Sequence, residues 1–377
     1  MNFPEIIAGL GIIWILLVIF RIWHKRKAIP LYSTPQEIEI TQKTQLLLSN
    51  GKLAKEGWTR NPLWIYDRKF IHANSLRIKE WDYYAIMSHD RKFCICATIS
   101  DLGFGGFMAL AFIDLENRKF YQQDSLKLFT FGSLNLSKSP NEDNIVQYHD
   151  NNINLIFLKE GNVRKLNLSA SNLKIGNKTG LTCELELYQP EDLESMSIAT
   201  SWAENRKAFY LNTKINCMKT EGSIKIGNDN LDFGKNVWTV LDWGRGFWTY
   251  SNTWLWSSVS GTINGEEFGW NLGYGFTDRS PASENVIIYK RKVHKLGLIS
   301  IIKDKNDYMK QWTISGQNLN IIFTPILDRS SNTNFLIIKS VQHQLFGTFS
   351  GTVTLNDSTT LEINNMLGFA EEVYNRW

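Results

Sequence analysis

The sequence predicts an all-β protein, in which two tandem antiparallel barrels or sandwiches follow one N-terminal transmembrane helix. Three observations indicate this. Runs with strand-like alternation recur at spacings of roughly 8 to 12 residues, which is typical of sandwiches and barrels. No long amphipathic helical pattern separates these runs, which disfavours a parallel α/β sheet. One continuous apolar run near the N-terminus is long enough to span a membrane.

The composition indicates a folded, aromatic-rich body with little net charge. Hydrophobic residues make up 43% of the 377 residues and charged residues 21%, which argues against disorder. A chain of this length favours two domains. Residues 1–27 carry +3 of the total net charge of +4, so about +1 is left for the body. We therefore expect no nucleic-acid partner, because no basic surface remains to follow a phosphate backbone.

The membrane anchor is predicted at residues 6–23, an apolar run interrupted only by Arg21 near its end. A helix of this length spans roughly 27 Å, close to the thickness of a bilayer core. Three cations follow at residues 25–27, so the positive-inside rule places the N-terminus outside and the body in the cytoplasm. We expect a membrane anchor at 1–27 and a linker at 28–37, with the lipid bilayer as partner and the cell membrane as location.

The first β domain is predicted at residues 38–190. Its strand-like runs are separated by turn residues, and residues 189–195, which include a proline and three acidic residues, suit a connection to the next domain. The predicted strands cover residues 81–87, 92–100, 106–114, 119–122, 145–148, 153–158, 163–168 and 181–187.

The second β domain is predicted at residues 191–377. Asn264 and Gly265 stand between two strand-like runs, which is a strong signal for a two-residue hairpin. The predicted strands cover residues 209–219, 221–226, 238–248, 253–260, 268–276, 286–289, 312–315, 319–324, 342–349 and 351–355.

The most unusual motif is Asp-Trp-Gly-Arg-Gly at residues 242–246, with further tryptophans close by. In a functional interpretation, Asp242 and Arg245 form a charged pair at the mouth of an aromatic cavity that Trp243 helps to line. Burial would then raise the pKa of Asp242 until it serves as a general acid. In a structural interpretation, Arg245 stacks on a tryptophan and pairs with Asp242 to lock a sharp bend. The residues leave both interpretations open.

A second group of candidate ligand-binding residues surrounds the predicted hairpin. Trp254 and Trp256 are expected to share one face of a strand, because side chains alternate with a period of two. Asn271, Tyr274 and Glu284 add polar groups to the same region. The glycines near Asn271 leave room for a neighbour or a ligand, and the lysine of a phosphate-binding loop is missing.

Histidines and cysteines offer few further candidates. His294 is a candidate catalytic residue and His343 a candidate ligand-binding residue, but each stands alone, without the spacing of metal ligands. Cys94 and Cys96 are expected on one face of a strand as buried, reduced thiols. We therefore expect neither a metal site nor a cofactor.

Several motifs follow one another from residue 38 to the C-terminus. They are Trp81-Asp82-Tyr83-Tyr84, Val240-Leu241-Asp242-Trp243-Gly244-Arg245-Gly246, Trp254-x-Trp256, Asn271-Leu272-Gly273, Glu284-Asn285, His294-Lys295, His343-x-x-Phe346-Gly347-x-Phe349-Ser350-Gly351 and the segment from Gly368 to Trp377. In combination they resemble domain-of-unknown-function family 2804, which has no assigned activity. The expected two-barrel arrangement is more distantly similar to carotenoid hydratases and tocopherol cyclases, which are double lipocalin-like proteins that protonate a double bond with a carboxylic acid. That similarity implies lipocalin-like barrels and makes Asp242 the first acid to test.

Three hypotheses for the function follow. The favoured one is a binding module that holds a lipid or another apolar small molecule at the inner membrane face. The second is a cofactor-independent hydratase, cyclase or isomerase acting on an apolar substrate, with Asp242 as the acid and Arg245 or His294 assisting. The third is a structural or interaction protein whose tryptophans only fill the core. The sequence leaves open whether the protein is an enzyme.

Overall fold

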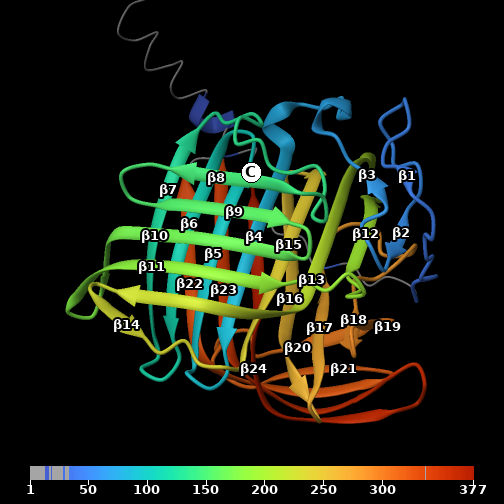
Figure 1. The fold of residues 1–377 in the computed structure, drawn as a ribbon. Helices are drawn as coiled ribbons and strands as arrows, with labels where there is room; N and C mark the ends of the chain where they lie inside the picture. Colours follow the sequence, from blue (N-terminus) through green and yellow to red (C-terminus); the bar gives the residue numbers. More distant parts are fainter. Residues whose placement is uncertain (1–12, 17, 19–28, 30–33, 336) are drawn as a thin grey trace, which may run out of the picture.

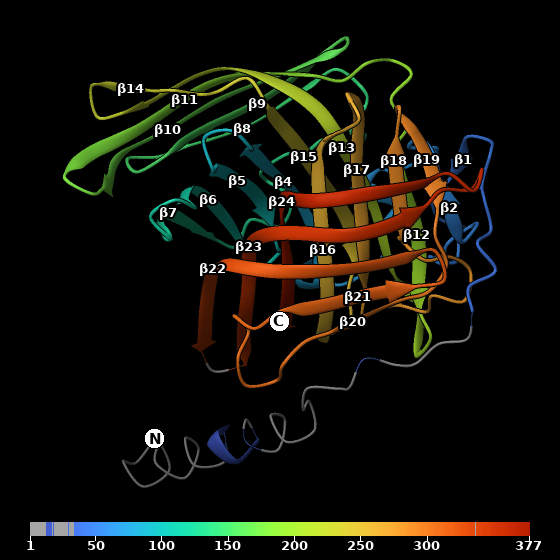
Figure 2. The ribbon, with the colours of Figure 1, turned by 90° about the horizontal axis from the view of Figure 1, so that it is seen from below.

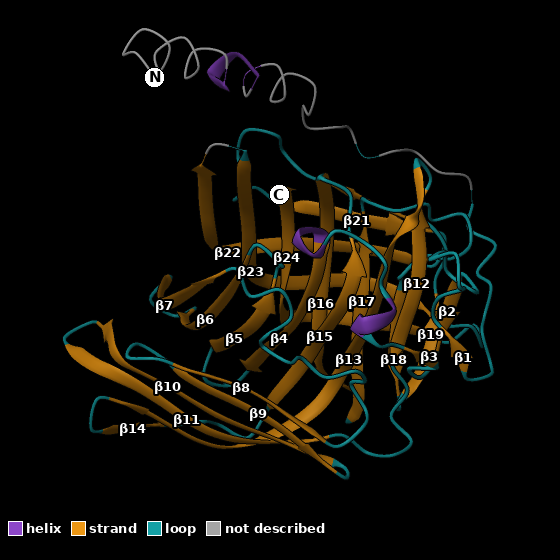
Figure 3. Cartoon of the chain, turned by 90° about the horizontal axis from the view of Figure 1, so that it is seen from above, coloured by secondary structure: helices purple, strands orange, loops and turns teal. Residues whose placement is uncertain are grey.

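The computed structural model describes residues 13–16, 18, 29, 34–335 and 337–377. The predicted membrane anchor therefore lies almost entirely outside the described residues, as does part of the predicted linker. No helix among the described residues is both long and apolar enough to cross a bilayer. Strands dominate the described structure (Figure 3), which confirms the predicted all-β fold class.

Within the described residues, thirteen strands form the first antiparallel sheet (Figure 1). They are β2 (Gly57–Thr59), β4 (Ile78–Ser88), β5 (Phe93–Asp101), β6 (Gly105–Asp114), β7 (Lys119–Leu128), β8 (Asn144–His149), β9 (Asn154–Glu160), β10 (Val163–Ile175), β11 (Lys178–Tyr188), β12 (Met196–Trp202), β13 (Asn205–Ile226), β14 (Asp229–Leu231) and β15 (Val237–Phe247). Their order is β7-β6-β5-β4-β15-β13-β11-β10-β9-β8, while β12 and β14 also pair with β13, and β2 pairs with β12.

The first sheet curls over itself, because β8 to β11 lie across β4 to β7 (Figure 1). In β11, every second residue from Leu181 to Leu187 is buried and the residues between them are exposed. This is the pattern of a strand with one face on a core and one in water. The buried faces of the two halves enclose a core that includes Phe112, Phe157 and Leu166. The sheet therefore has an inner face towards this core and an outer face beyond it.

Nine strands form the second antiparallel sheet of the described structure. They are β16 (Ser251–Ile263), β17 (Glu266–Tyr274), β18 (Val286–Tyr289), β19 (Lys292–Lys295), β20 (Ile299–Ile302), β21 (Trp312–Gly316), β22 (Leu319–Phe335), β23 (Ile338–Thr354) and β24 (Thr360–Arg376). Their order is β19-β18-β17-β16-β24-β23-β22-β21-β20. This sheet also curls over itself (Figure 2). It encloses a core of its own, with Trp270, Trp312 and Phe349 among the buried residues.

Short elements complete the described fold. β1 (Thr44–Gln45) and β3 (Trp64–Ile65) form a two-stranded parallel sheet. Two 3-10 turns, η1 (Arg68–Phe70) and η2 (Ser75–Arg77), precede β4. Asp67 and Asn74 begin these turns, and each side chain accepts a hydrogen bond from the backbone two residues later.

The two sheets pack against each other through a layer that we call the middle layer. It includes Met87, Cys96 and Val240 from the outer face of the first sheet, and Trp256 and Phe369 from the second. These residues are far apart in sequence and come from β4, β5, β15, β16 and β24. The middle layer is therefore the place where the two halves of the chain can build a shared site.

Two local predictions can be compared with the structure. Asn264 and Gly265 both have positive φ, 54° and 81°, and they join β16 to β17, as the hairpin prediction requires. The chain passes from the first sheet to the second between β15 and β16, so residues 242–246 belong to the first sheet. A change of sheet is not by itself a domain boundary, and the division at 190/191 stays a prediction.

Candidate functional site

The candidate site lies in the middle layer. Antiparallel register pairs Asp242 on β15 with Lys214 on β13 and with Tyr83 on β4, and cross-strand partners share a face. All three therefore lie on the outer face of the first sheet. On the facing side, register pairs Glu371 on β24 with Trp256 on β16. The two sheets thus place charged and aromatic side chains opposite one another.

Lys214 and Asp242 form a buried ion pair at the centre of the site. The Lys214 Nζ lies 2.7 Å from Asp242 Oδ2, and the Asn212 amide donates to Asp242 Oδ1 at 2.6 Å. The ammonium also lies 3.7 Å from the centroid of the Trp256 ring, a cation–π contact with the second sheet. Either group without its partner would be an uncompensated buried charge, which is energetically costly. The ion pair therefore keeps the two groups together.

Glu371 is the carboxyl whose protonation is tuned to neutral pH. Its residue is only 5% exposed. Burial raises the pKa of Glu371 to about 7, and the nearby charge of Asp242 acts in the same direction. The Trp254 Nε1–H donates to its Oε1 at 2.9 Å, and the Gln344 amide donates to its Oε2 at 3.2 Å. A carboxyl with a pKa near 7 can both give and take a proton at neutral pH, as general acid–base catalysis requires.

A third carboxyl in the site belongs to Glu284, which lies in the segment between β17 and β18. Burial raises its pKa, while the charge of Lys214 and a hydrogen bond from Asn271 oppose the rise. The Asn271 amide donates to the Glu284 carbonyl at 2.8 Å and to its Oε2 at 3.2 Å. Gly273 leaves the space that this carboxyl occupies, since a Cβ there would lie 3.0 Å from Oε1. Three carboxyls thus surround one ammonium group.

Aromatic rings form one side of the site. Trp81 stacks on Tyr210 with centroids 6.3 Å apart, and Trp248 packs edge-on against Trp81 at 5.5 Å. From the second sheet, the Trp254 and Phe276 rings meet edge-on at 5.7 Å. Trp81, Trp254 and Phe276 are partly exposed, so solvent reaches this side of the layer. The site combines ionisable groups with partly exposed aromatic rings.

The two glycines of the 242–246 motif allow these rings to lie against β15. A Cβ at Gly244 would lie 2.0 Å from a ring atom of Trp81, and one at Gly246 would lie 2.8 Å from Nε1 of Trp248. A larger residue at either position would displace a ring. The glycines therefore serve close approach on a regular strand, and the sharp bend of the structural interpretation is wrong.

Arg245 does not pair with Asp242, which corrects both sequence-based interpretations of the motif. Residues at odd spacing on a strand point to opposite faces, so Arg245 and Trp243 lie on the inner face. There the Arg245 guanidinium lies 2.9 Å from Asp82 and 4.1 Å from the Trp243 ring centroid. It also donates to the Ser137 carbonyl at 2.9 Å. The predicted stacking on a tryptophan is confirmed, and the structure assigns both residues to the core side of β15.

The two histidines lie elsewhere. His294 on β19 accepts a hydrogen bond from the Asn356 backbone at 3.4 Å, and burial lowers its pKa. His343 Nδ1 lies 2.7 Å from Asp328 Oδ2, and its ring stacks on Tyr308 at 3.8 Å. Because Gln344, the next residue, faces the site, His343 faces the opposite side of the second sheet. The structure therefore brings neither histidine to Asp242.

The other predicted residues divide between the two faces of the second sheet. Trp254, Trp256, Asn271 and Glu284 meet in the middle layer, where the Trp256 Nε1–H donates to Asn271 Oδ1 at 2.6 Å. Tyr274 lies on the opposite face, packed against the second core, where its hydroxyl accepts from the Ile301 backbone at 3.0 Å. Four of these five candidates therefore lie in the middle layer together with Asp242.

Sequence reasoning missed several residues of the site, among them Lys214, Tyr210, Gln344 and Glu371. One signal was present, since Lys214 is the only charged residue within residues 208–218. Glu371 lies within the C-terminal motif that carries the family resemblance, but nothing local distinguishes it from Glu372. Burial raises the pKa of Tyr210 well above its usual value, and the three carboxyls add to the rise. Tyr210 is therefore a protonated hydroxyl beside the cluster.

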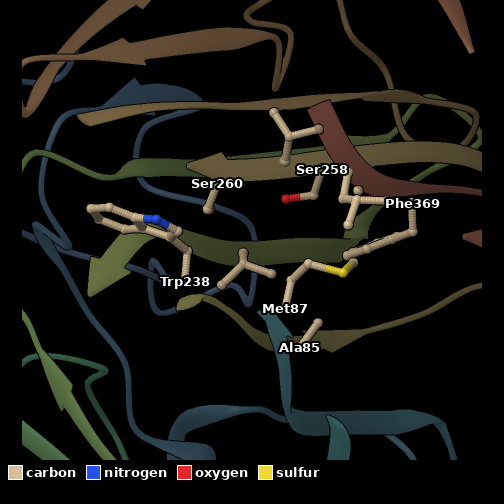
Figure 4. A pocket seen from close by; sticks show the side chains of 10 residues that line it. Ala85, Met87, Trp238, Ser258, Ser260 and Phe369 are labelled. Carbon is tan, nitrogen blue, oxygen red and sulfur yellow. The ribbon is translucent and has the colours of Figure 1, made fainter. Parts of the chain in front are cut away.

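Cys94, Cys96 and a small cavity lie in the same layer. The two sulfur atoms are 3.8 Å apart and both cysteines are buried and free, as predicted. Met87 and Phe369 are among the side chains that line this cavity (Figure 4). Val240 and Phe369 in the lining stand two residues from Asp242 and Glu371, and so on the same strand faces. The volume of the cavity is about 10 Å³, which is about the space of one water molecule.

No metal centre is found in the part of the chain that the structure describes. Within it, no group of three or more His, Cys, Asp or Glu residues is arranged to hold a metal ion. The chemistry that the described site offers is proton transfer and charge stabilisation by carboxyls, a lysine and aromatic rings.

Comparisons with known proteins place the chain in a family. No curated protein matches it. A crystal structure of kievitone hydratase from Nectria haematococca shares 15% identity with a TM-score of 0.48, over 78% of this chain and 88% of that one. A putative AttH from Nitrosomonas europaea shares 11% identity with a TM-score of 0.43, over 82% and 96%. CghA shares 7% identity with a TM-score of 0.43, over 82% and 90%.

Similarities at this level carry no argument about function. The family assignment is stronger, because the model of the family described as domain of unknown function DUF2804 matches residues 37–377, which include every strand of the described structure. The predicted family resemblance is confirmed: the chain belongs to the DUF2804 family.

Proposed function

We propose that the protein is an enzyme of the hydratase, cyclase or isomerase type, which protonates a largely apolar, uncharged molecule at the site of Glu371. The observation that carries the proposal is the environment of Glu371, a buried carboxyl with a pKa of about 7 beside the Lys214–Asp242 ion pair. Perturbed carboxyls that face one another are typical of acid–base catalysis. The partly exposed rings of Trp81 and Trp254 offer the apolar contacts.

The proposed reaction begins with proton transfer from Glu371. The O–H bond of its neutral carboxyl breaks, and a C–H bond forms at an electron-rich double bond of the substrate, which becomes a carbocation. The carboxylate of Asp242 and the π faces of Trp81 and Trp254 stabilise this charge. Lys214 holds the Asp242 carboxylate in place through their 2.7 Å ion pair, while Glu371 supplies the proton, so the two carboxyls have different roles.

Three outcomes restore the proton balance. A water molecule can add to the carbocation and give its extra proton to the Glu371 carboxylate, which is hydration. A neighbouring carbon can lose a proton to the same carboxylate, which is isomerisation. A second double bond or hydroxyl of the substrate can attack the carbocation before the proton is lost, which is cyclisation. Glu371 regains its proton in every case, so one residue serves as acid and then as base.

We further propose that the substrate is lipid-soluble and reaches the protein at the inner face of the cell membrane. The supporting observation is the apolar run at residues 6–23 with its basic flank, which predicts an anchor there. An anchored body would meet apolar molecules where they dissolve.

Binding without turnover is the second candidate, and the density of rings around the cluster favours it. The centroid of the Trp248 ring, for example, lies within 6 Å of the ring centroids of four other residues: Trp81, Trp202, Trp254 and Phe276. Such a set can hold an apolar ligand by contact area alone. The two candidates differ in whether solvent protons enter the ligand.

The test uses a lipid extract from the source cells, incubated with the protein in D2O and followed by mass spectrometry. Turnover predicts at least one species that gains deuterium on carbon with the wild-type protein. Glu371→Gln should lose this labelling and still retain the species on the protein, because an amide keeps the shape but donates no acidic proton. Glu362→Gln, on an exposed position of the same strand, is the matched control.

Labelling that is unchanged in Glu371→Gln would remove this residue from the mechanism. Retention of a species without any labelling in the wild-type protein would favour the binding module. No retention and no labelling would contradict both candidates.

A further inference from the structure

One end of the first sheet carries an exposed apolar surface that the site above does not use. Leu126 and Leu128 end β7, and Phe129 and Phe131 follow in the next loop; their exposed fractions are 74%, 73%, 66% and 46%. We call these four residues the apolar tip. Single exposed hydrophobic residues are ordinary, but a contiguous group of large ones marks an interaction site.

The apolar tip is held in a fixed shape from below. The buried carboxylate of Asp101 accepts hydrogen bonds from Gly103 N–H at 3.0 Å, from the Thr130 hydroxyl at 2.8 Å and from Gly132 N–H at 2.7 Å. The Phe131 N–H also donates to the Gly103 carbonyl at 3.1 Å. These bonds fix the loop on both sides of Phe131, so the fold itself holds the Phe131 side chain in an exposed position.

Backbone strain supports the same conclusion. Phe129 and Phe131 both have positive φ, 55° and 49°, a region that bulky residues rarely adopt. Such a conformation is energetically unfavourable for a bulky side chain. The two rings stack on each other with centroids 6.0 Å apart, and both stay in solvent. Two residues with an unfavourable backbone conformation therefore hold their aromatic rings in solvent.

Neighbouring residues enlarge the surface and give it positive charge. Phe70 is 52% exposed and Leu76 is 39% exposed, and a Cβ at Gly103 would lie 3.1 Å from the Leu76 backbone, so this segment adjoins the loop. Lys69 and Lys138 are exposed and share the carboxylate of Asp67, at 3.3 Å and 2.9 Å. Lys127, within β7, is exposed as well. Asp124, also on β7, is exposed too, so three ammonium groups stand against two carboxylates and the rim keeps a net charge of +1.

We propose that the apolar tip inserts into the surface of a lipid bilayer with anionic headgroups. Aliphatic side chains and phenylalanines on a protruding loop match fluid acyl chains, whereas protein-binding hot spots are rich in Trp, Tyr and Arg, which the tip lacks. The long side chains of Lys69, Lys127 and Lys138 can reach lipid phosphates and carboxylates while the tip is immersed. The predicted anchor would bring a bilayer within reach. This contact is independent of any catalytic activity and would orient the body on the membrane.

The experiment places an environment-sensitive fluorophore on the tip of the full-length protein. Phe129→Cys is labelled with an NBD maleimide, which is selective because the native cysteines are buried. The protein is reconstituted into vesicles of phosphatidylcholine with phosphatidylserine, with a nitroxide quencher confined to the bilayer. The control is Asn177→Cys, which carries the same label at an exposed turn between β10 and β11.

The proposal predicts a blue-shifted emission at position 129 and at least twofold stronger quenching there than at position 177. Replacing Lys69 and Lys127 with glutamate should weaken the quenching at 129 at least twofold and leave the spectrum at 177 unchanged. Equal, weak quenching at both positions in anionic vesicles would overturn the proposal. A blue shift at 129 in these vesicles without quenching by the bilayer-confined nitroxide would overturn it as well, because the tip would then be covered by a second copy of the chain.

Discussion

Replacing Glu371 with glutamine should make the stability of the protein less sensitive to pH. Burial holds the folded-state pKa of this carboxyl at about 7, whereas an unfolded glutamate has its usual value of 4.5. Between these two pH values the folded state binds a proton that the unfolded state has released. The free energy of unfolding therefore falls as the pH rises through this window.

The size of the effect follows from the shift. One pKa unit corresponds to 1.36 kcal/mol, so a rise from 4.5 to about 7 is worth about 3 kcal/mol. The wild-type protein has the full contribution below pH 4.5 and has lost it above pH 7. A glutamine at position 371 does not titrate. The stability difference, variant minus wild type, should therefore become more positive by about 3 kcal/mol between pH 4.5 and pH 8.

The assay is urea unfolding of both proteins at several pH values, followed by tryptophan fluorescence. Other titrating groups act on both proteins alike and cancel in the difference, which makes the comparison specific. Glu362→Gln supplies the control, because this exposed side chain should give a constant difference. A difference between Glu371→Gln and wild type that stays constant across the range would refute the assigned pKa and the buried, proton-holding role of Glu371.

Three further predictions concern neighbouring residues. Arg245→Met should destabilise the fold by about 3–5 kcal/mol, measured by urea unfolding, because it leaves Asp82 as an unpaired buried charge. Gly244→Ala should cost about 1–3 kcal/mol in the same assay and reduce labelling in D2O, since the new Cβ collides with Trp81. Lys214→Met should raise the pKa of Glu371 further and shift the pH profile of labelling upward, because the lysine charge opposes that rise. A stable Arg245→Met protein, an unperturbed Gly244→Ala protein or an unshifted profile would contradict the corresponding assignment.

Local patterns predicted many of the strands, because the alternation of side chains along a strand can be recognised from adjacent residues. They did not predict β12, β20 or β24. Asn264 and Gly265 fixed a hairpin in the same way, since both adopt the positive φ that such turns need. The curl of each sheet depends on pairing between distant segments. Nothing near Asp242 reveals that β15 pairs with β4 on one side and β13 on the other. The sheet to which the motif belongs was therefore not predictable from the motif.

The candidate site was predicted in part for the same reason. Asp242, Trp254 and Trp256 stood out through composition, and they do lie together. The predicted pairing of Asp242 with Arg245 conflicts with strand geometry, because positions three apart on a strand point to opposite faces. Glu371 was not recognisable from its surroundings, since its pKa arises from burial against residues distant in the chain.

The most direct test of the account is the titration of the Glu371 carboxyl itself. Carbon-13 NMR of protein with labelled glutamate, compared with Glu371→Gln to assign the resonance, reports its protonation between pH 4 and pH 9. The burial of Glu371 predicts a midpoint near 7, which would make this residue a proton donor at neutral pH. A midpoint near 4.5 would show an ordinary carboxylate and would contradict the proposed reaction.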